Sequence, residues 1–143
     1  QARRLDEAIA HYEQLLKANP KVDVAANNLA SLLLDYRSDA ASYARALELV
    51  KPLESTSNPA VLDTVGWAYY RNKDYPKAVS FLERAVAGAG QLQLLRYHLG
   101  MAYIATKNTA GARQELKQAV TGAQADYPGL VEAKAALAKL GAG

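Results

Sequence analysis

The feature that most constrains this chain is an internal repeat with a period of 34 residues. Residues one period apart are identical at several positions where a change of residue type would alter the packing. Glycine is matched by glycine, tyrosine by tyrosine, alanine by alanine and leucine by leucine. The matched pairs are Gly66 with Gly100, Tyr69 with Tyr103, Ala78 with Ala112, Leu82 with Leu116, and Ala85 with Ala119. A period of this length is typical of a unit of two short helices that buries its apolar faces by stacking on neighbouring units.

The composition agrees with a helical fold. The chain has 143 residues, of which 50% are hydrophobic, so it can bury a continuous core without a metal. Alanine and leucine dominate, and the prolines and most glycines fall between periodic segments, which favours helices over strands. Cysteine is absent, which excludes disulfide frameworks, cysteine-bound zinc and thiol nucleophiles. We therefore expect an all-α fold.

The charge pattern bears on the choice of partner. The chain carries 17 basic and 14 acidic residues, a net charge of +3, and both signs are interspersed. Such a distribution creates no strong field, so we expect no nucleic-acid partner. No apolar run approaches the roughly 20 residues that cross a bilayer, so we expect no direct membrane insertion by this chain.

The repeated residues resemble the motif of the tetratricopeptide repeat (TPR) family. The first helix of the unit carries the apolar-glycine pair Val65-Gly66 and Tyr69, and the second carries an alanine, a bulky apolar residue and another alanine. The resemblance implies a right-handed α-solenoid of antiparallel helix hairpins. Because antiparallel helices approach closely where side chains are small, we expect Gly66 to contact Ala78 across the hairpin. Leu82 and Tyr69 are expected to fill the space between neighbouring hairpins.

The chain is predicted to form a single TPR domain over residues 1–143. It divides into the second helix of a truncated repeat at 1–22, an irregular repeat at 23–58, repeats at 59–92 and 93–126, and a capping helix and tail at 127–143. Helices are predicted at 5–19, 23–35, 40–54, 59–72, 75–87, 91–106, 109–121 and 128–140. We expect about four extra residues in the turn of the irregular repeat, with Pro52 kinking or ending its second helix and Gly88, Gly90 and Gly122 closing two later helices.

Two further expectations concern the ends of the chain. The helix that follows Gln1 lacks the first helix of its repeat, so we expect the full protein to extend upstream. The last segment has Leu130, Ala133 and Leu137 on one face and charged residues on the rest, which is typical of a helix that caps the end of an array.

The sequence offers little that could catalyse a reaction. Its two histidines, His11 and His98, are far apart, and neither has an acidic or histidine partner at helical spacing, so both are expected to be surface residues. The segment Gly88-Ala89-Gly90 lacks the lysine of a phosphate-binding loop. We expect no enzyme activity, no metal and no cofactor.

The resemblance implies that the first helix of each hairpin lines a concave groove. The matching positions form a mixed polar and aromatic strip, namely Asn27, Asn28, Ser31 and Asp35, then Asp63, Thr64, Trp67, Tyr70 and Arg71, then Tyr97, His98 and Met101. Trp67 lies about 100° around its helix from Gly66, which predicts that it faces the groove. It could anchor a ligand or pack against Tyr70 or Met101, and both alternatives stay open.

The resemblance also distinguishes between kinds of partner. The TPR proteins that grip acidic chaperone tails use lysines on these faces. This chain has none at the matching positions and adds Asp35 and Asp63, so chaperone binding is not expected. We predict a scaffold or adaptor that binds a peptide or partner helix of another protein in the groove.

Two alternatives concern assembly and location. The amino-terminal helix is expected to expose Ile9, Tyr12 and Leu16, through which a structural assembly module could self-associate into a homo-oligomer. The stretch from Asp63 to Arg71 also resembles repeats of bacterial envelope and exopolysaccharide-export TPR proteins. A periplasmic or envelope-associated location is therefore favoured over a cytoplasmic one.

Overall fold

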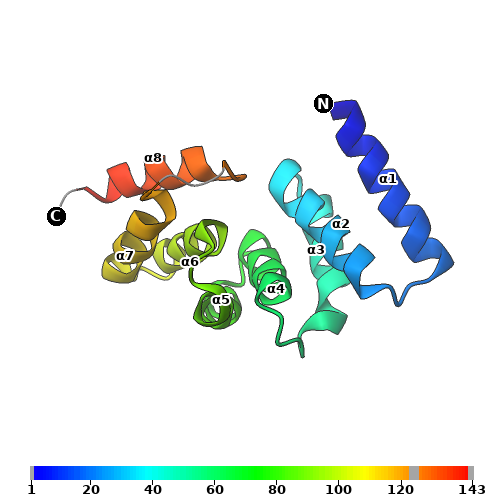
Figure 1. Cartoon of the computed structure of the whole chain (residues 1–143), viewed down its shortest axis with the longest axis horizontal. Helices are drawn as coiled ribbons and strands as arrows, with labels where there is room; N and C mark the ends of the chain where they lie inside the picture. Colours follow the sequence, from blue (N-terminus) through cyan, green and yellow to red (C-terminus); the bar gives the residue numbers. More distant parts are fainter. Residues whose placement is uncertain (1, 123–125, 142–143) are drawn as a thin grey trace.

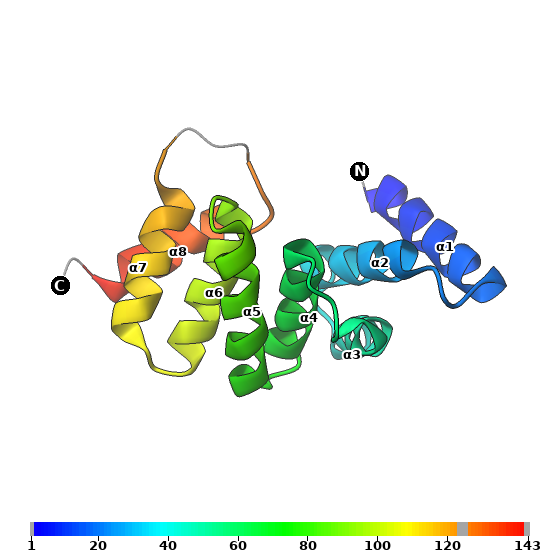
Figure 2. The same ribbon diagram turned by 60° about the horizontal axis from the view of Figure 1, so that its bottom comes forward.

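The computed structural model describes residues 2–122 and 126–141, and within them it contains eight α-helices, one 3-10 turn and no strand. The prediction of an all-α solenoid of helix hairpins with a capping helix is confirmed (Figures 1 and 2). The helices are α1 (Ala2–Ala18), α2 (Asp23–Tyr36), α3 (Ala40–Val50), the 3-10 turn η1 (Lys51–Leu53), α4 (Pro59–Arg71), α5 (Tyr75–Ala89), α6 (Gln93–Ala105), α7 (Thr109–Val120) and α8 (Leu130–Leu140).

Three hairpins follow one another along the molecule (Figure 1). α2 pairs with α3, α4 with α5, and α6 with α7, while α1 packs on α2 at one end and α8 packs on α7 and α6 at the other. The first helices of the hairpins also contact one another, α2 with α4 and α4 with α6. In the part of the chain that the structure describes, no helix has the length and apolar character needed to cross a membrane.

The second helix of every hairpin begins at a polar cap. The side-chain oxygens of Asp39, Asp74 and Asn108 accept hydrogen bonds from backbone N–H groups three residues later, at 2.9, 3.3 and 3.0 Å. These bonds satisfy amides that the helix itself leaves unpaired. Each cap ends a connection of three residues, at 37–39, 72–74 and 106–108. The prediction of a longer turn in the first hairpin is therefore wrong.

The irregularity of the first hairpin lies after its second helix instead. α3 ends at Val50, and Pro52 sits in the 3-10 turn that follows, as expected of a residue without a backbone N–H. Residues 54–58 then lead to α4, whereas only residues 90–92 separate α5 from α6. Gly88 was expected to end a helix but lies inside α5, which continues to Ala89.

The two helices of each regular hairpin come close together at a glycine. A β-carbon added to Gly66 would lie 2.7 Å from Leu82 Cγ and 3.2 Å from the Leu82 backbone nitrogen, and one added to Gly100 would lie 2.7 Å from Leu116 Cγ. The side chain nearest to Gly66 is therefore that of Leu82, one turn beyond Ala78 on α5, and the expected contact with Ala78 stays a prediction. Leu82 is completely buried and packs against Gly66 within its own hairpin.

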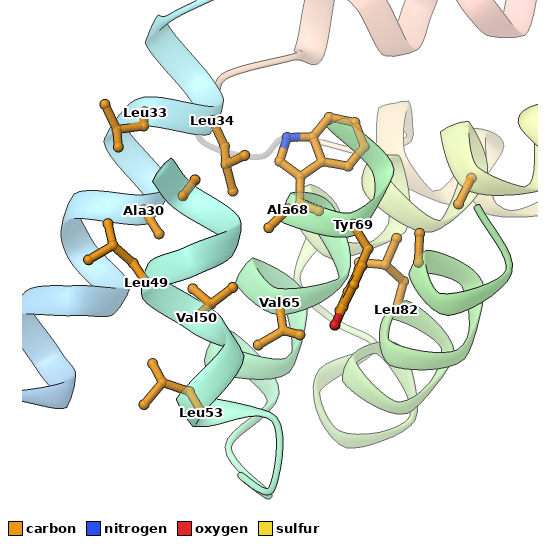
Figure 3. Packing of buried hydrophobic residues seen from close by; sticks show 14 of the residues in the cluster. Ala30, Leu33, Leu34, Leu49, Val50, Leu53, Val65, Ala68, Tyr69 and Leu82 are labelled. Carbon is orange, nitrogen blue, oxygen red and sulfur yellow. The ribbon is translucent and has the colours of Figure 1, made fainter. Parts of the chain in front are cut away.

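The larger of two apolar clusters runs through the array. It reaches from Leu16 on α1 to Ala133 on α8, so neighbouring hairpins share buried side chains. Figure 3 shows its central part, where α2, α3 and α4 meet through Ala30, Leu33, Leu34, Leu49, Val50, Val65 and Ala68. Because this core is continuous, it fixes the positions of α2, α4 and α6 relative to one another. Their relative positions define the shape of the groove.

The amino-terminal helix does not present the surface that the sequence suggested. Leu16 is buried, and Ile9 and Tyr12 are partly buried against the core, because this face of α1 packs on α2. Asn28 on α2 donates a hydrogen bond from Nδ2 to the Tyr12 hydroxyl, at 3.3 Å. The expectation that these three residues are exposed is therefore wrong.

Candidate functional site

The first helices α2, α4 and α6 bound two neighbouring cavities, and the segment before α8 contributes to both. The first cavity, of about 380 Å³, lies toward the amino-terminal ends of these helices and includes Asn27, Ser31, Asp63 and Thr64. The second, of about 330 Å³, lies toward their carboxyl-terminal ends. Its lining includes Asp35, Trp67, Tyr70, Arg71, Tyr97 and Met101. Ten of the twelve predicted groove residues thus line one cavity or the other.

Hydroxyl groups connect α2 and α4 beside the first cavity. Ser31 Oγ and Thr64 Oγ1 lie 3.3 Å apart, and Thr64 also donates to the Ala60 backbone oxygen at 3.1 Å. Asn27 Oδ1 is buried and has no hydrogen-bond partner among the described residues. The first cavity therefore presents polar groups next to the apolar side chains of Leu94 and Leu95.

Trp67 is packed rather than half-exposed. Only 2% of its surface is accessible, and its ring stacks on Tyr70 at 4.4 Å and on His98 at 3.9 Å between centroids. The ring of Tyr97 lies tilted against it at 5.6 Å. Trp67 still lines the second cavity, so it forms part of the aromatic floor of the groove instead of projecting from it.

A buried histidine–aspartate contact lies beneath this floor. His98 Nδ1 is 2.7 Å from Asp63 Oδ1, and the two side chains are 3% and 8% exposed. The expectation of a surface histidine is correct for His11 and wrong for His98. Its carboxylate partner comes from the preceding hairpin, 35 residues away, and not from its own helix. Through its stack on Trp67, the pair helps to fix the position of the indole.

Two predicted groove residues line neither cavity. His98 lies behind Trp67, in the contact with Asp63 just described, and Asn28 is directed toward α1 by its hydrogen bond to Tyr12. The prediction also missed six contributors to the second cavity, namely Arg37, Ser38, Tyr43, Pro128, Gly129 and Glu132. These lie outside the first helices, and the repeat pattern therefore contains no signal for them.

Arg71 is held by aromatic faces. Its guanidinium carbon lies 4.7 Å from the Trp67 ring and 5.4 Å from the Tyr43 ring, distances that allow cation–π attraction. Its Nε is buried without a hydrogen-bond partner, and no ion pair of the described residues includes it. The guanidinium is thus positioned by packing and does not depend on a carboxylate.

Burial changes the ionisation of groups around the second cavity. It raises the pKa of Asp35, an effect that Asp63 reinforces and that His98 and Arg71 oppose. Burial also raises the pKa of the Tyr97 phenol to about 12, so this hydroxyl stays protonated at neutral pH. The cavity therefore combines hydroxyl donors, carboxylates and aromatic surface. Among the described residues no cluster of three or more potential metal ligands occurs.

The segment before α8 closes one side of the groove. The Tyr127 hydroxyl donates to the Ala119 backbone oxygen at 2.7 Å, and its ring lies 6.2 Å from that of Tyr97. Gly129 has φ +108° and sits so close to Tyr97 that an added β-carbon would be 2.2 Å from Cε2. Only glycine tolerates both the backbone conformation and this contact. α8 therefore begins against the groove and does more than cover the last hairpin.

Comparison with known proteins agrees with this architecture. A sequence profile described as tetratricopeptide repeat matches residues 69–140, and a second profile with the same description matches residues 1–22. A search of the curated proteins finds no match. Among solved structures, TTC0263, a thermophilic TPR protein of Thermus thermophilus, is similar with a TM-score of 0.72 and 26% identity. This alignment covers 97% of this chain and 74% of that protein.

Two other solved structures share the fold at lower identity. The alignment with MamA has a TM-score of 0.69 and 21% identity, and it covers 95% of this chain and 76% of that one. The alignment with the Sgt2 TPR domain from Aspergillus fumigatus has a TM-score of 0.53 and 22% identity, with 77% and 80% covered. Since the first profile alone spans half of the sequence, the chain belongs to the tetratricopeptide repeat family, whose members generally act as non-enzymatic scaffolds for protein interaction.

Proposed function

We propose that the concave groove binds a peptide or a partner helix of another protein, so that the chain acts as an adaptor. The observation that carries this proposal is the pair of neighbouring cavities bounded by the same three helices, α2, α4 and α6. Both contain polar groups beside apolar or aromatic surface, a combination that orients a ligand as well as burying it.

The spacing of the cavities suits a chain-like ligand. Asp63 lines the first cavity and Tyr70 the second, and seven positions along α4 separate them by about 10 Å. Three residues of an extended peptide span roughly this distance, as do seven residues of a helix. One ligand can therefore place a side chain in each cavity, whereas either cavity alone would hold little more than one side chain.

The test compares two serine substitutions on different faces. Ser31 lines the first cavity on α2, whereas Ser80 is exposed on α5, the second helix of its hairpin. A random peptide library is selected on the parent chain, and the affinity of the enriched peptides is then measured. Ser31→Arg should weaken binding at least tenfold, because the long side chain fills the cavity, and Ser80→Arg should have no effect. Equal affinity of the two variants, with both folded by circular dichroism, would exclude the groove.

Self-association through α1 is the second candidate. The exposure of Leu15 supports this candidate. This large apolar side chain on α1 is 42% exposed, whereas its neighbour Leu16 is buried. Sedimentation equilibrium at increasing concentration should then reveal dimers that Leu15→Glu abolishes. A monomer at all concentrations would eliminate this candidate and leave the groove proposal unaffected.

We further infer a bacterial envelope setting for the protein. The support is the resemblance of the stretch from Asp63 to Arg71 to repeats of envelope and exopolysaccharide-export proteins, which covers one helix, α4. Periplasmic or envelope-associated location can be tested by fractionating cells that express the natural protein from its own gene. Recovery in the cytoplasmic fraction alone would refute it.

A further inference from the structure

The second cavity brings together charged groups from three helices and a connecting turn. Asp35 lies at the end of α2, Arg37 follows it in the turn, Arg71 ends α4, and Glu132 lies in the first turn of α8. Two carboxylates thus face the same space, of about 330 Å³, from helices that are far apart in the sequence.

The two cations of this cavity are already engaged. Arg37 forms an ion pair with Asp6 on α1, so its charge is neutralised by a residue outside the cavity. Arg71 lies over the rings of Trp67 and Tyr43. Neither Asp35 nor Glu132 belongs to any ion pair of the described residues. With the Arg37–Asp6 pair set aside, two carboxylates against one guanidinium leave the cavity with one net negative charge.

The walls of the cavity also suit a cation. Tyr43, Tyr70 and Tyr97 line it together with Met101, so an entering side chain meets aromatic faces and a thioether. Aromatic faces attract cations electrostatically and provide apolar contact for an alkyl stem. Among natural side chains, lysine and arginine combine such a stem with a positive end, and both are long enough to enter a cavity of this volume.

Resting on the groove function proposed above, we propose that the second cavity is a specificity pocket for a lysine or arginine side chain of the bound peptide, with Asp35 and Glu132 receiving its charge. The capping helix α8 is then a functional part of the groove, because it supplies Glu132 and the turn at Gly129 that closes the pocket.

An acidic or neutral side chain fits this pocket less well. A ligand carboxylate would meet Asp35 and Glu132, and the one guanidinium without a carboxylate partner, that of Arg71, already lies over the rings of Trp67 and Tyr43. A neutral side chain would leave the half-buried Asp35 carboxylate without a direct counter-charge. Burial raises the pKa of Asp35, which is the expected state of a carboxylate that lacks a direct partner until a cation binds.

The test uses a capped peptide library with random flanks and one fixed central residue, selected on the parent chain. We expect enrichment of peptides with central lysine or arginine over otherwise identical peptides with norleucine or glutamate. Affinity is followed through the fluorescence of Trp67, which is the only tryptophan of the chain and lines the pocket. Asp35→Asn should weaken the best lysine peptide about tenfold, as expected when a charge-assisted contact in a partly buried site becomes neutral.

Two further variants complete the design. Glu132 is more exposed than Asp35, so Glu132→Gln should weaken the lysine peptide only about threefold. Glu7→Gln, on the exposed surface of α1, should leave the affinity unchanged and controls for the loss of one negative charge from the molecule. Norleucine peptides should bind Asp35→Asn and Glu132→Gln at least as tightly as the parent chain, and Glu7→Gln equally.

Each outcome separates this inference from the groove function. Enriched peptides that show no preference for a basic residue would overturn the specificity pocket and leave the groove as the binding site. The specificity pocket is also overturned if the ratio of affinities for lysine and norleucine peptides is the same for Asp35→Asn as for the parent chain. A library from which the parent chain enriches no peptide would overturn both proposals.

Discussion

At the scale of single residues, Asp35 connects stability with binding. Burial is the largest influence on this carboxyl group and raises its pKa above the ordinary value of 3.8. An acid whose pKa is raised by folding binds its proton more tightly in the folded state. The stability that comes from this tighter proton binding is therefore fully present below pH 3.8, and it is lost as the pH rises through the folded-state pKa of Asp35. At neutral pH the ionised carboxylate lowers the free energy of unfolding.

Replacing this carboxyl group should consequently stabilise the protein. We predict that Asp35→Asn has a higher free energy of unfolding than the parent chain at pH 7, because the amide is neutral at every pH. The difference should shrink as the pH falls and vanish below pH 3.8, where Asp35 is protonated in both states. Urea unfolding at a series of pH values measures this difference directly.

The matched control is again Glu7→Gln, whose stability relative to the parent should show no such gain at pH 7, since Glu7 is exposed on α1. A loss of stability in Asp35→Asn at pH 7 would mean that Arg71 and His98 outweigh burial. A gain would mark Asp35 as a residue kept at a cost in stability, as is common for binding residues.

His98 illustrates how far the sequence predicts such a site. Its partner Asp63 is 35 residues away, one more than the repeat period. The residue equivalent to His98 in the preceding repeat is Thr64, so His98 contacts the residue just before its equivalent. That offset depends on the rotation between hairpins, which the pattern of matched residues does not contain. The sequence therefore identified both residues as groove candidates but placed His98 on the surface.

At the scale of elements, the two regular hairpins share an unusual turn. Lys73 and Lys107 occupy equivalent positions one period apart, and both have positive φ, at 68° and 65°. Residues with a β-carbon are strained in this left-handed region, whereas glycine is not. The turn of the first hairpin contains Ser38, which does not have a positive φ.

We predict that Lys73→Gly and Lys107→Gly each raise the free energy of unfolding by about 0.5–1 kcal/mol, because relief of strain exceeds the added entropy of the unfolded chain. The corresponding change at Ser38 relieves no strain, so Ser38→Gly should be neutral or slightly destabilising. Thermal and urea unfolding of the three variants provide the comparison. If all three shifted stability in the same direction by the same amount, the backbone conformation would not be the cause.

The helices themselves were predictable, and their contacts were less so. Apolar periodicity and polar caps gave the order and approximate ends of all eight described helices, because these signals are local. The closest neighbour of Gly66, Leu82, was not predicted, since Ala78 and Leu82 lie on the same face of α5 and only the stagger of the two helices decides which lies nearer. Glu132 lies outside the repeats, so no repeat-based argument could place it in the groove.

At the scale of the whole molecule, stability should vary along the array. In a stacked repeat each unit contacts only its neighbours, so damage at one end propagates weakly to the other. Here α8 packs on α7 and α6, while α2 and α3 belong to the first hairpin and have no substantial contact with it. The second cavity, however, takes residues from both α2 and α8 and therefore depends on the whole span.

Detaching the capping helix should separate stability, which is lost only near α8, from the second cavity, which depends on both α2 and α8. Ala133 is fully buried in the core, whereas Ala135, on the same helix, is exposed. We predict that Ala133→Asp destabilises the attachment of α8 by about 3–5 kcal/mol, because it buries an unpaired carboxylate, and that Ala135→Asp has little effect. Hydrogen exchange should show faster exchange for amides of α7 and α8 in Ala133→Asp, with α2 and α3 still protected.

The binding consequence follows from the position of Glu132, one residue before Ala133. When α8 detaches, the second cavity loses this carboxylate and the wall formed at Gly129, while Asp35 and Trp67 remain in place. Ala133→Asp should therefore weaken peptides with a central lysine more than those with norleucine, and Ala135→Asp should preserve the difference between them. Equal weakening of both peptides would mean that α8 supports the groove only as a whole and contributes nothing to its choice of side chain.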